Sequence, residues 1–314
     1  MKTKRKIWLG VGAFVVAGAS ATGAAPLTGG KVPDLRATTD LVTDAAIPRS
    51  SPAGFVLAQH DDHAPKAGGS GEEGGEKGVA TLPPPLAFGT RIAWLRGHLL
   101  VGDELVKQRQ WNAALPHFLH PSEEIYGDIK EQLAEYKVPP FEDALKALAG
   151  VVKAKKGGND YAKAFKSVSD ALAAADAGMK DRETDWAGFV VSAAIETVKS
   201  AAGEYQQAII GGRIAKPVEY QDARGFIFHA ERMIESVAPD LQKKDASGFR
   251  ALRAGFAELK KAFPSPMPPR APVKDHGTFL GDVSRIESFA FGALANGCGT
   301  KTPGFFYGPR YHSP

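Results

Sequence analysis

Between Arg91 and Asn296, apolar residues recur three and four positions apart, the spacing that places side chains on one face of an α-helix. Proline and glycine concentrate at the breaks in this pattern, and no stretch alternates as a strand between hairpin turns does. The sequence therefore predicts an all-α fold, a helical bundle. The expected helices lie near residues 90–109, 112–136, 140–156, 159–178, 184–211, 217–240, 245–263 and 278–295.

Two segments of this helical region resemble each other, and they predict two related helical-hairpin halves. The first runs from Gly97 to His120 and the second from Gly203 to His229. In each, a long helix ends in a short polar break, and a second helix carries a histidine six residues after an alanine. Halves packed around a pseudo-twofold axis would bring polar residues of both together. Chance similarity between alanine-rich helices is the alternative.

The first residues, Met1 to Ala25, have the order of an export signal. Four basic residues precede the apolar stretch Ile7 to Ala19, which is too short to span a bilayer, and small residues follow it. Cleavage is expected after Ala21 or Ala25, so the protein is predicted to be periplasmic or secreted. An uncleaved anchor helix is the alternative reading.

The organisation expected for the remaining chain follows from its composition. Residues 26–87 are rich in glycine, proline and alanine and lack apolar periodicity, which is typical of a flexible leader. Residues 88–298 form the predicted helical domain, and residues 299–314 form a C-terminal tail.

Charge and cysteine content exclude several classes of function. Of the 39 basic residues, four lie in the predicted signal, which leaves 35 against 35 acidic residues. A neutral mature chain gives no electrostatic reason to bind nucleic acid. The single cysteine, Cys298, excludes an internal disulfide and a multi-cysteine metal site. No nucleophile elbow, phosphate loop, metalloprotease helix or dinucleotide fingerprint is found, so we predict that the protein is not an enzyme.

A dense group of histidines and glutamates, His117, His120, Glu123 and Glu124, points to metal binding. Positions three and four apart share a helix face, so His120 can present its ring beside Glu123 or Glu124. A His-x-x-Glu pair within a bundle is a known way to hold a metal. The alternative is that Pro121 begins a helix, with the two glutamates serving its dipole and the histidines merely packed.

Three further residues are predicted to converge on this group because of the internal similarity. His98 lies 22 residues before His120, and Glu204 lies 25 residues before His229. His229 has no carboxylate three or four positions later, because Arg232 and the following methionine occupy those places. A buried histidine bonded to a helix carbonyl or to Glu204 is the alternative for this half.

The order of these features resembles the imelysin-like family, which includes periplasmic components of bacterial iron uptake. That family is all-helical, is built from two related bundles, and has a Gly-x-His-x-x-Glu motif to which His120 and Glu123 correspond. Here Phe118 stands in place of the motif's glycine, and Pro121 follows the histidine. The stretches 194–205 and 214–222 resemble the family's later helices. The resemblance covers 91–263 and implies metal binding in the periplasm.

The sequence thus predicts an exported helical protein that binds a metal ion between helices. Nitrogen and oxygen ligands without thiolate suit iron, copper or zinc, with iron or copper favoured. Expected partners are the metal and a membrane transporter or periplasmic protein. The rival prediction is a helical interaction scaffold without a metal, in which the histidines would scatter rather than point inward together. The predicted metal residues are His98, His117, His120, Glu123, Glu124, Glu204 and His229.

Overall fold

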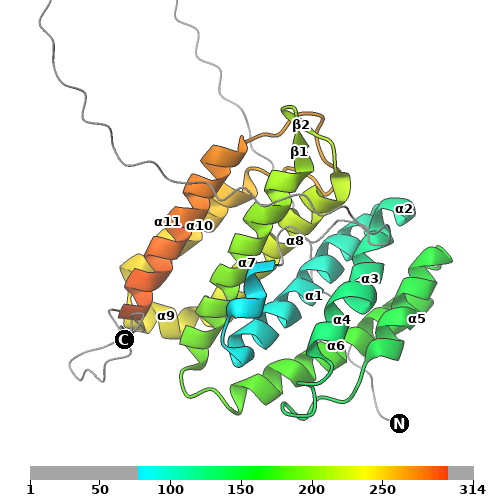
Figure 1. Ribbon diagram of the computed structural model, residues 1–314, viewed down its shortest axis with the longest axis horizontal. Helices are drawn as coiled ribbons and strands as arrows, with labels where there is room; N and C mark the ends of the chain where they lie inside the picture. The colour runs from blue at the N-terminus through cyan, green and yellow to red at the C-terminus, as the bar shows by residue number, and fades with distance from the viewer. Residues whose placement is uncertain (1–76, 296–314) are drawn as a thin grey trace, which may run out of the picture. The chain divides into compact units, whose positions relative to one another are not determined.

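The structure is a computed structural model that describes residues 77–295, and it confirms the predicted all-α helical bundle (Figure 1). The predicted signal peptide, most of the leader and the C-terminal tail lie outside the described residues. After a 3-10 turn, η1 (Lys77–Thr81), the longer helices are α1 (Pro84–Lys107), α5 (Glu142–Lys153), α6 (Gly158–Lys180), α7 (Trp186–Ala208), α8 (Pro217–Ser236), α10 (Ala246–Lys260) and α11 (His276–Ala295), with the short α9 (Ala238–Lys244) between α8 and α10.

Proline accounts for the main differences from the predicted helix bounds. The first helix begins at Pro84, so the last residues of the predicted leader belong to η1 and to the first turn of α1. Proline is tolerated in a first turn because the amide it lacks has no helical partner there. The predicted helix over 112–136 is broken into α2 (Trp111–Ala114), α3 (Pro116–His120), a π-helical turn η2 (Pro121–Ile125) and α4 (Tyr126–Ile129).

Glycine ends the predicted helix over 184–211 early. Gly211 and Gly212 have φ values of +58° and +72°, a conformation that glycine adopts without steric cost. They form the turn of a two-stranded antiparallel hairpin between β1 (Ile209–Ile210) and β2 (Arg213–Ile214).

Helix α1 occupies the centre of the arrangement (Figure 1). It packs against α7 and α8 on one side and against α3 and α6 on the other. Helices α7, α8, α10 and α11 pack on one another as a group, and α5 packs on α3 and α6. A continuous apolar core runs through all of these layers. None of the described helices has the length and apolar character needed to span a bilayer.

Glycine allows α1 to approach its neighbours closely. A Cβ atom on Gly225 of α8 would lie 2.3 Å from the carbonyl oxygen of Gly97, so the two backbones touch where α1 and α8 cross. A Cβ atom on Gly102 would lie 2.7 Å from the ring of Phe118, which seats α3 on α1 one turn further along.

Candidate metal centre

Three helices bring two histidines and an aspartate together in the interior. His98 comes from α1, His117 from α3 and Asp222 from α8, and the side chains are almost fully buried. His98 Nδ1 lies 2.6 Å from Asp222 Oδ1, and His117 Nδ1 donates a hydrogen bond of 2.8 Å to the same oxygen. One ligating atom from each of the three residues lies within 4.8 Å of the other two.

The close helix contacts explain why these side chains meet. His98 follows Gly97 directly, and Asp222 lies one helical turn before Gly225, so the α1–α8 crossing places both beside the point where the backbones touch. Residue His117 precedes Phe118, whose ring fills the space that Gly102 leaves open. Small residues at two crossings therefore bring the three ligands within reach.

The charges around Asp222 keep its carboxylate ionised. Burial alone would raise the pKa of this carboxyl, but the charges of His98 and His117, together with hydrogen bonds from both rings, hold the pKa well below its usual range. Ionised carboxylate and imidazole nitrogen are the forms in which aspartate and histidine bind metals.

A second layer of contacts orients His117. Its Nε2 atom lies 3.0 Å from Oε1 of Gln221, and the Nε2 group of Gln221 donates to the carbonyl oxygen of Pro266 at 3.1 Å. A histidine that binds a metal through one ring nitrogen commonly donates its other N–H to a carbonyl or carboxylate oxygen. Gln221 supplies that acceptor, which leaves Nδ1 of His117 as the atom directed at Asp222.

His120 forms the outer edge of this cluster. Its Nδ1 atom lies 3.8 Å from Asp222 Oδ2, and its ring is 5.4 Å from that of His98 and 6.5 Å from that of His117, measured between centroids. Three of the predicted histidines thus come together and point inward, as the metal-binding prediction requires. His120 does not belong to the group whose ligating atoms all lie within 4.8 Å of one another.

The predicted pairing of His120 with Glu123 on one inward face is wrong. His120 is buried, whereas Glu123 is exposed. The reason is the π-helical turn after Pro121, in which the amide of Tyr126 bonds to the carbonyl of Pro121 five residues earlier. This wider turn rotates Glu123 outward. Glu124 is half-buried on the same turn.

The predicted convergence of His229 with this cluster is also wrong. His229 lies on α8 seven residues after Asp222, a rise of about 10 Å along the helix. Its side chain lines a separate cavity beside Arg96 of α1. Glu204 is buried on α7, which packs against both α1 and α8. Its role as a ligand, like that of Glu124, stays a prediction.

Asp222 is the member of this group that sequence reasoning missed. It stands in the polar run Glu219-Tyr-Gln-Asp222, which has no histidine three or four positions away. The one signal was an acidic residue within a stretch whose neighbours, Ala223, Phe226 and Ile227, are apolar. That pattern places Asp222 among buried positions, where a carboxylate requires a partner.

The geometry suits a metal ion. An ion with metal–ligand bonds of about 2.0–2.2 Å holds adjacent ligand atoms roughly 3 Å apart. The two histidine nitrogens already lie 2.6 and 2.8 Å from the carboxylate oxygen. An ion at this site would displace the protons that lie between the nitrogens and the carboxylate. Two histidines and one carboxylate form the donor set that proteins use for non-haem Fe(II).

The second half of the helical region matches a known family. Residues 180–291 match the model of the iron permease-associated 4-helix bundle domain. The match takes in α7 to α10 and most of α11, and it includes Asp222 but neither His98 nor His117. No curated protein and no solved structure shows a significant match. The match covers less than half of the chain and supports the coarser part of the predicted resemblance, a helical domain related to iron uptake.

Proposed function

We propose that the protein is exported and binds iron at the His98–His117–Asp222 site as part of iron uptake. The observation that supports this most directly is the convergence of three buried ligands from three different helices. Buried charged groups are costly unless they are paired or bind a metal, and here two histidine nitrogens lie 2.6 and 2.8 Å from one carboxylate oxygen.

One observation favours iron over the other metals, because the matched family is described as iron permease-associated. Two histidines and one carboxylate hold non-haem Fe(II), and the same donor set also holds catalytic zinc, so the ligands alone do not choose between these two metals.

The chain's own residues determine how the ion would enter and leave. Asp222 supplies the negative charge that attracts a cation into a buried position, and Gln221 holds His117 in the orientation needed for binding. Loading would release the protons that now lie between the rings and the carboxylate, so affinity should fall as the pH falls. A site of this kind can accept and release an ion with no change to the protein beyond the loss and return of these protons.

A membrane transporter is the partner that the family description supports. The export signal predicted over residues 1–25 supports a periplasmic or secreted location for the encounter. Mass spectrometry of the mature protein should find an N-terminus near residue 22 or 26, and a retained Met1 would count against export.

The experiment that tests the proposal compares two buried carboxylates on the same helix. Asp222→Asn removes the charge at the site and keeps the side-chain shape. Glu219→Gln makes the same chemical change at a residue paired with Lys216 at 2.9 Å, away from the histidines. Both proteins are loaded anaerobically with Fe(II), and separately with Cu(II) and Zn(II), and bound metal is measured by mass spectrometry after desalting.

We expect the parent and Glu219→Gln to retain about one Fe(II) per chain and Asp222→Asn to retain almost none, since breaking one of three ligands removes the coordination. Equal metal content in all three proteins would overturn the proposal. The helical scaffold would then be the better reading, although scaffold histidines are expected to scatter, and His98, His117 and His120 instead cluster in the interior.

A further inference from the structure

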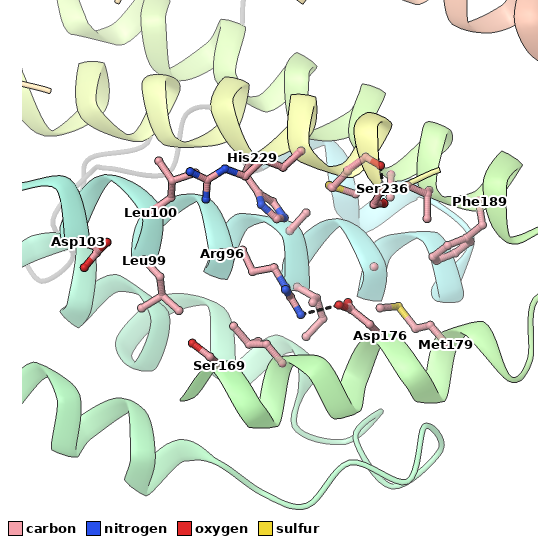
Figure 2. A pocket seen from close by; sticks show the side chains of 18 of the residues that line it. Arg96, Leu99, Leu100, Asp103, Ser169, Asp176, Met179, Phe189, His229 and Ser236 are labelled. Atoms are coloured by element: carbon pink, nitrogen blue, oxygen red, sulfur yellow. Dashed lines mark hydrogen bonds and ion pairs between the residues drawn. The ribbon is translucent and has the colours of Figure 1, made fainter. Parts of the chain in front are cut away.

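A cavity of about 570 Å³ lies between α1, α6, α7 and α8, apart from the histidine–aspartate centre (Figure 2). Arg96, Leu99, Leu100 and Asp103 of α1 line it, whereas His98 on the same helix turns toward α3 and α8. Its volume falls within the range, roughly 300–1,000 Å³, of pockets that hold small organic ligands.

Three basic residues, Arg96, Lys107 and Arg232, and three acidic residues, Asp103, Glu104 and Asp176, line the cavity. Lys107 is ion-paired to Asp103 and Glu104 to Arg224, which leaves Arg232, within residues 77–295, as the lining cation without an ion pair. The guanidinium of Arg96 extends across the cavity, and its Nη2 atom lies 2.6 Å from Oδ2 of Asp176 (Figure 2). Its Nε atom is buried and lacks a hydrogen-bond partner within residues 77–295. The ring of His229 points into the cavity from α8, and Arg232 lines the cavity one turn further along.

Burial favours the neutral forms of two titratable groups in the cavity, because it shifts the pKa of each toward the uncharged state. Burial, and then the charges of Arg96 and Arg232, lower the pKa of His229 to about 3, so the ring is neutral at pH 7. Burial raises the pKa of Asp176, against the opposing effect of Arg96. Asp176 stays ion-paired to Nη2 of Arg96 at 2.6 Å, so an anion that enters the cavity would meet the buried Nε atom of Arg96 instead.

Away from the charged groups, the walls of the cavity are apolar. Met179 and Phe189 stand at one end of the cavity, and Leu99 and Leu100 flank Arg96 toward the other end (Figure 2). Trp186 and Phe165 add aromatic surface. A ligand that fits needs an apolar body to cover these side chains and an anionic group to meet Arg96. A free inorganic anion would leave most of the apolar surface uncovered.

We propose that this cavity is a second binding site, which takes a small organic anion with an apolar body, such as an aromatic carboxylate or sulfonate, through Arg96, His229 and Arg232. The neutral ring of His229 and the Nε group of Arg96 each donate one hydrogen bond to the anionic group, and the guanidinium of Arg232 balances its charge. The site does not require a metal at the His98–His117–Asp222 centre, so either proposal can fail without the other.

The test uses two fluorescent probes that share one ring system, anilinonaphthalene sulfonate, which is an anion, and phenylnaphthylamine, which is neutral. Binding of each to the full-length protein is titrated for the parent and four variants. Arg96→Gln and Arg232→Gln remove the cations singly. Ala193→Leu fills the cavity from α7, where Ala193 lines it. Arg91→Gln is the matched control, because Arg91 lies on α1 and is ion-paired to Asp128 at 3.2 Å but does not line the cavity.

We expect Arg96→Gln to weaken binding of the anionic probe by about tenfold or more and to leave the neutral probe unchanged, since one charge-assisted hydrogen bond is lost. Arg232→Gln should weaken the anionic probe less, because this side chain is exposed. Ala193→Leu should weaken the binding of both probes, and Arg91→Gln should change the binding of neither. The proposal is overturned if the anionic probe binds all variants equally, or if Arg96→Gln weakens both probes alike. Should Arg96→Gln fail to fold, Arg232→Gln and Ala193→Leu decide the question.

Discussion

Replacing Gly225 with alanine should separate α1 from α8 and damage the metal centre. The added Cβ would lie 2.3 Å from the carbonyl oxygen of Gly97 and 2.9 Å from its carbonyl carbon. Ordinary contacts between such atoms are about 3.5 Å, so the helices must move apart by roughly 1 Å. Both contacting atoms belong to backbone, and no rotation of a side chain can relieve the clash.

The magnitude follows from two opposing effects. Forcing an extra carbon into a packed helix crossing costs about 1–3 kcal/mol. Alanine in place of glycine within a helix contributes about 0.5–1 kcal/mol of stability. The variant Gly225→Ala should therefore lose about 1–2 kcal/mol in the free energy of unfolding. With a slope of about 2 kcal/mol per molar, the urea midpoint falls by roughly 0.5–1 M.

The matched control is Gly150→Ala. Gly150 is exposed within α5, and a Cβ there would meet nothing within 4 Å. This variant should gain about 0.5–1 kcal/mol from helix propensity alone. Urea unfolding followed by circular dichroism measures both. If Gly225→Ala is as stable as the parent, the close crossing of α1 and α8 is not present in solution.

The same variant tests how the site depends on the crossing. A shift of roughly 1 Å between His98 and Asp222 exceeds the tolerance of about 0.5 Å for a working site. Fe(II) affinity should therefore fall by roughly tenfold or more, in line with changes to outer-shell support. Unchanged affinity in a destabilised variant would mean that the ligands adjust independently of the helices.

Three further predictions concern single residues. The pKa of His229 is about 3 in the folded protein against an ordinary 6.5, so its contribution to stability is full above pH 6.5 and is lost as the pH falls toward 3. His229→Gln should therefore reduce the drop in the urea midpoint between pH 7 and pH 5. An unchanged drop would contradict this. Asp245 caps α10 by accepting from the amides of Ser247 and Gly248, so Asp245→Ala should cost about 1 kcal/mol, measured by urea unfolding, whereas no loss would show that the cap is dispensable. Gln221→Leu should weaken Fe(II) binding by roughly 10- to 100-fold with little change in the helical spectrum, and full affinity would remove Gln221 from the site.

The helices were predictable because their signal is local. Apolar spacing within each segment and the prolines and glycines between segments sufficed for α5, α6, α7 and α10 to within a few residues. The prediction of one helix over 112–136 was wrong because Pro116 and Pro121 break its backbone hydrogen bonding. Whether a proline interrupts a helix depends on what the flanking turns pack against, and that is not a local signal.

The candidate metal centre was only half predictable, because its residues are brought together from distant parts of the sequence. The dense group of histidines pointed to α3 and the internal similarity pointed to His98 of α1, but helical spacing paired His120 with Glu123, a neighbour in sequence that the structure leaves exposed. The partner found in the structure, Asp222, is 105 positions beyond His117. No rule of helical spacing relates residues so far apart in the sequence. The glycine contact between α1 and α8 brings them together in space.

Because the three residues come from distant parts of the sequence, a bound ion would hold those parts of the chain together. Two ligands come from helices that precede the family match, and one comes from within it. An ion held by all three is a cross-link between the two parts of the domain, and it forms only in the folded chain. At a free concentration one hundred times its dissociation constant, it would add about 2.7 kcal/mol to the free energy of unfolding. Proteases that attack opened chains would then remove the empty protein faster than the loaded one, so the lifetime of the protein would follow the supply of its metal.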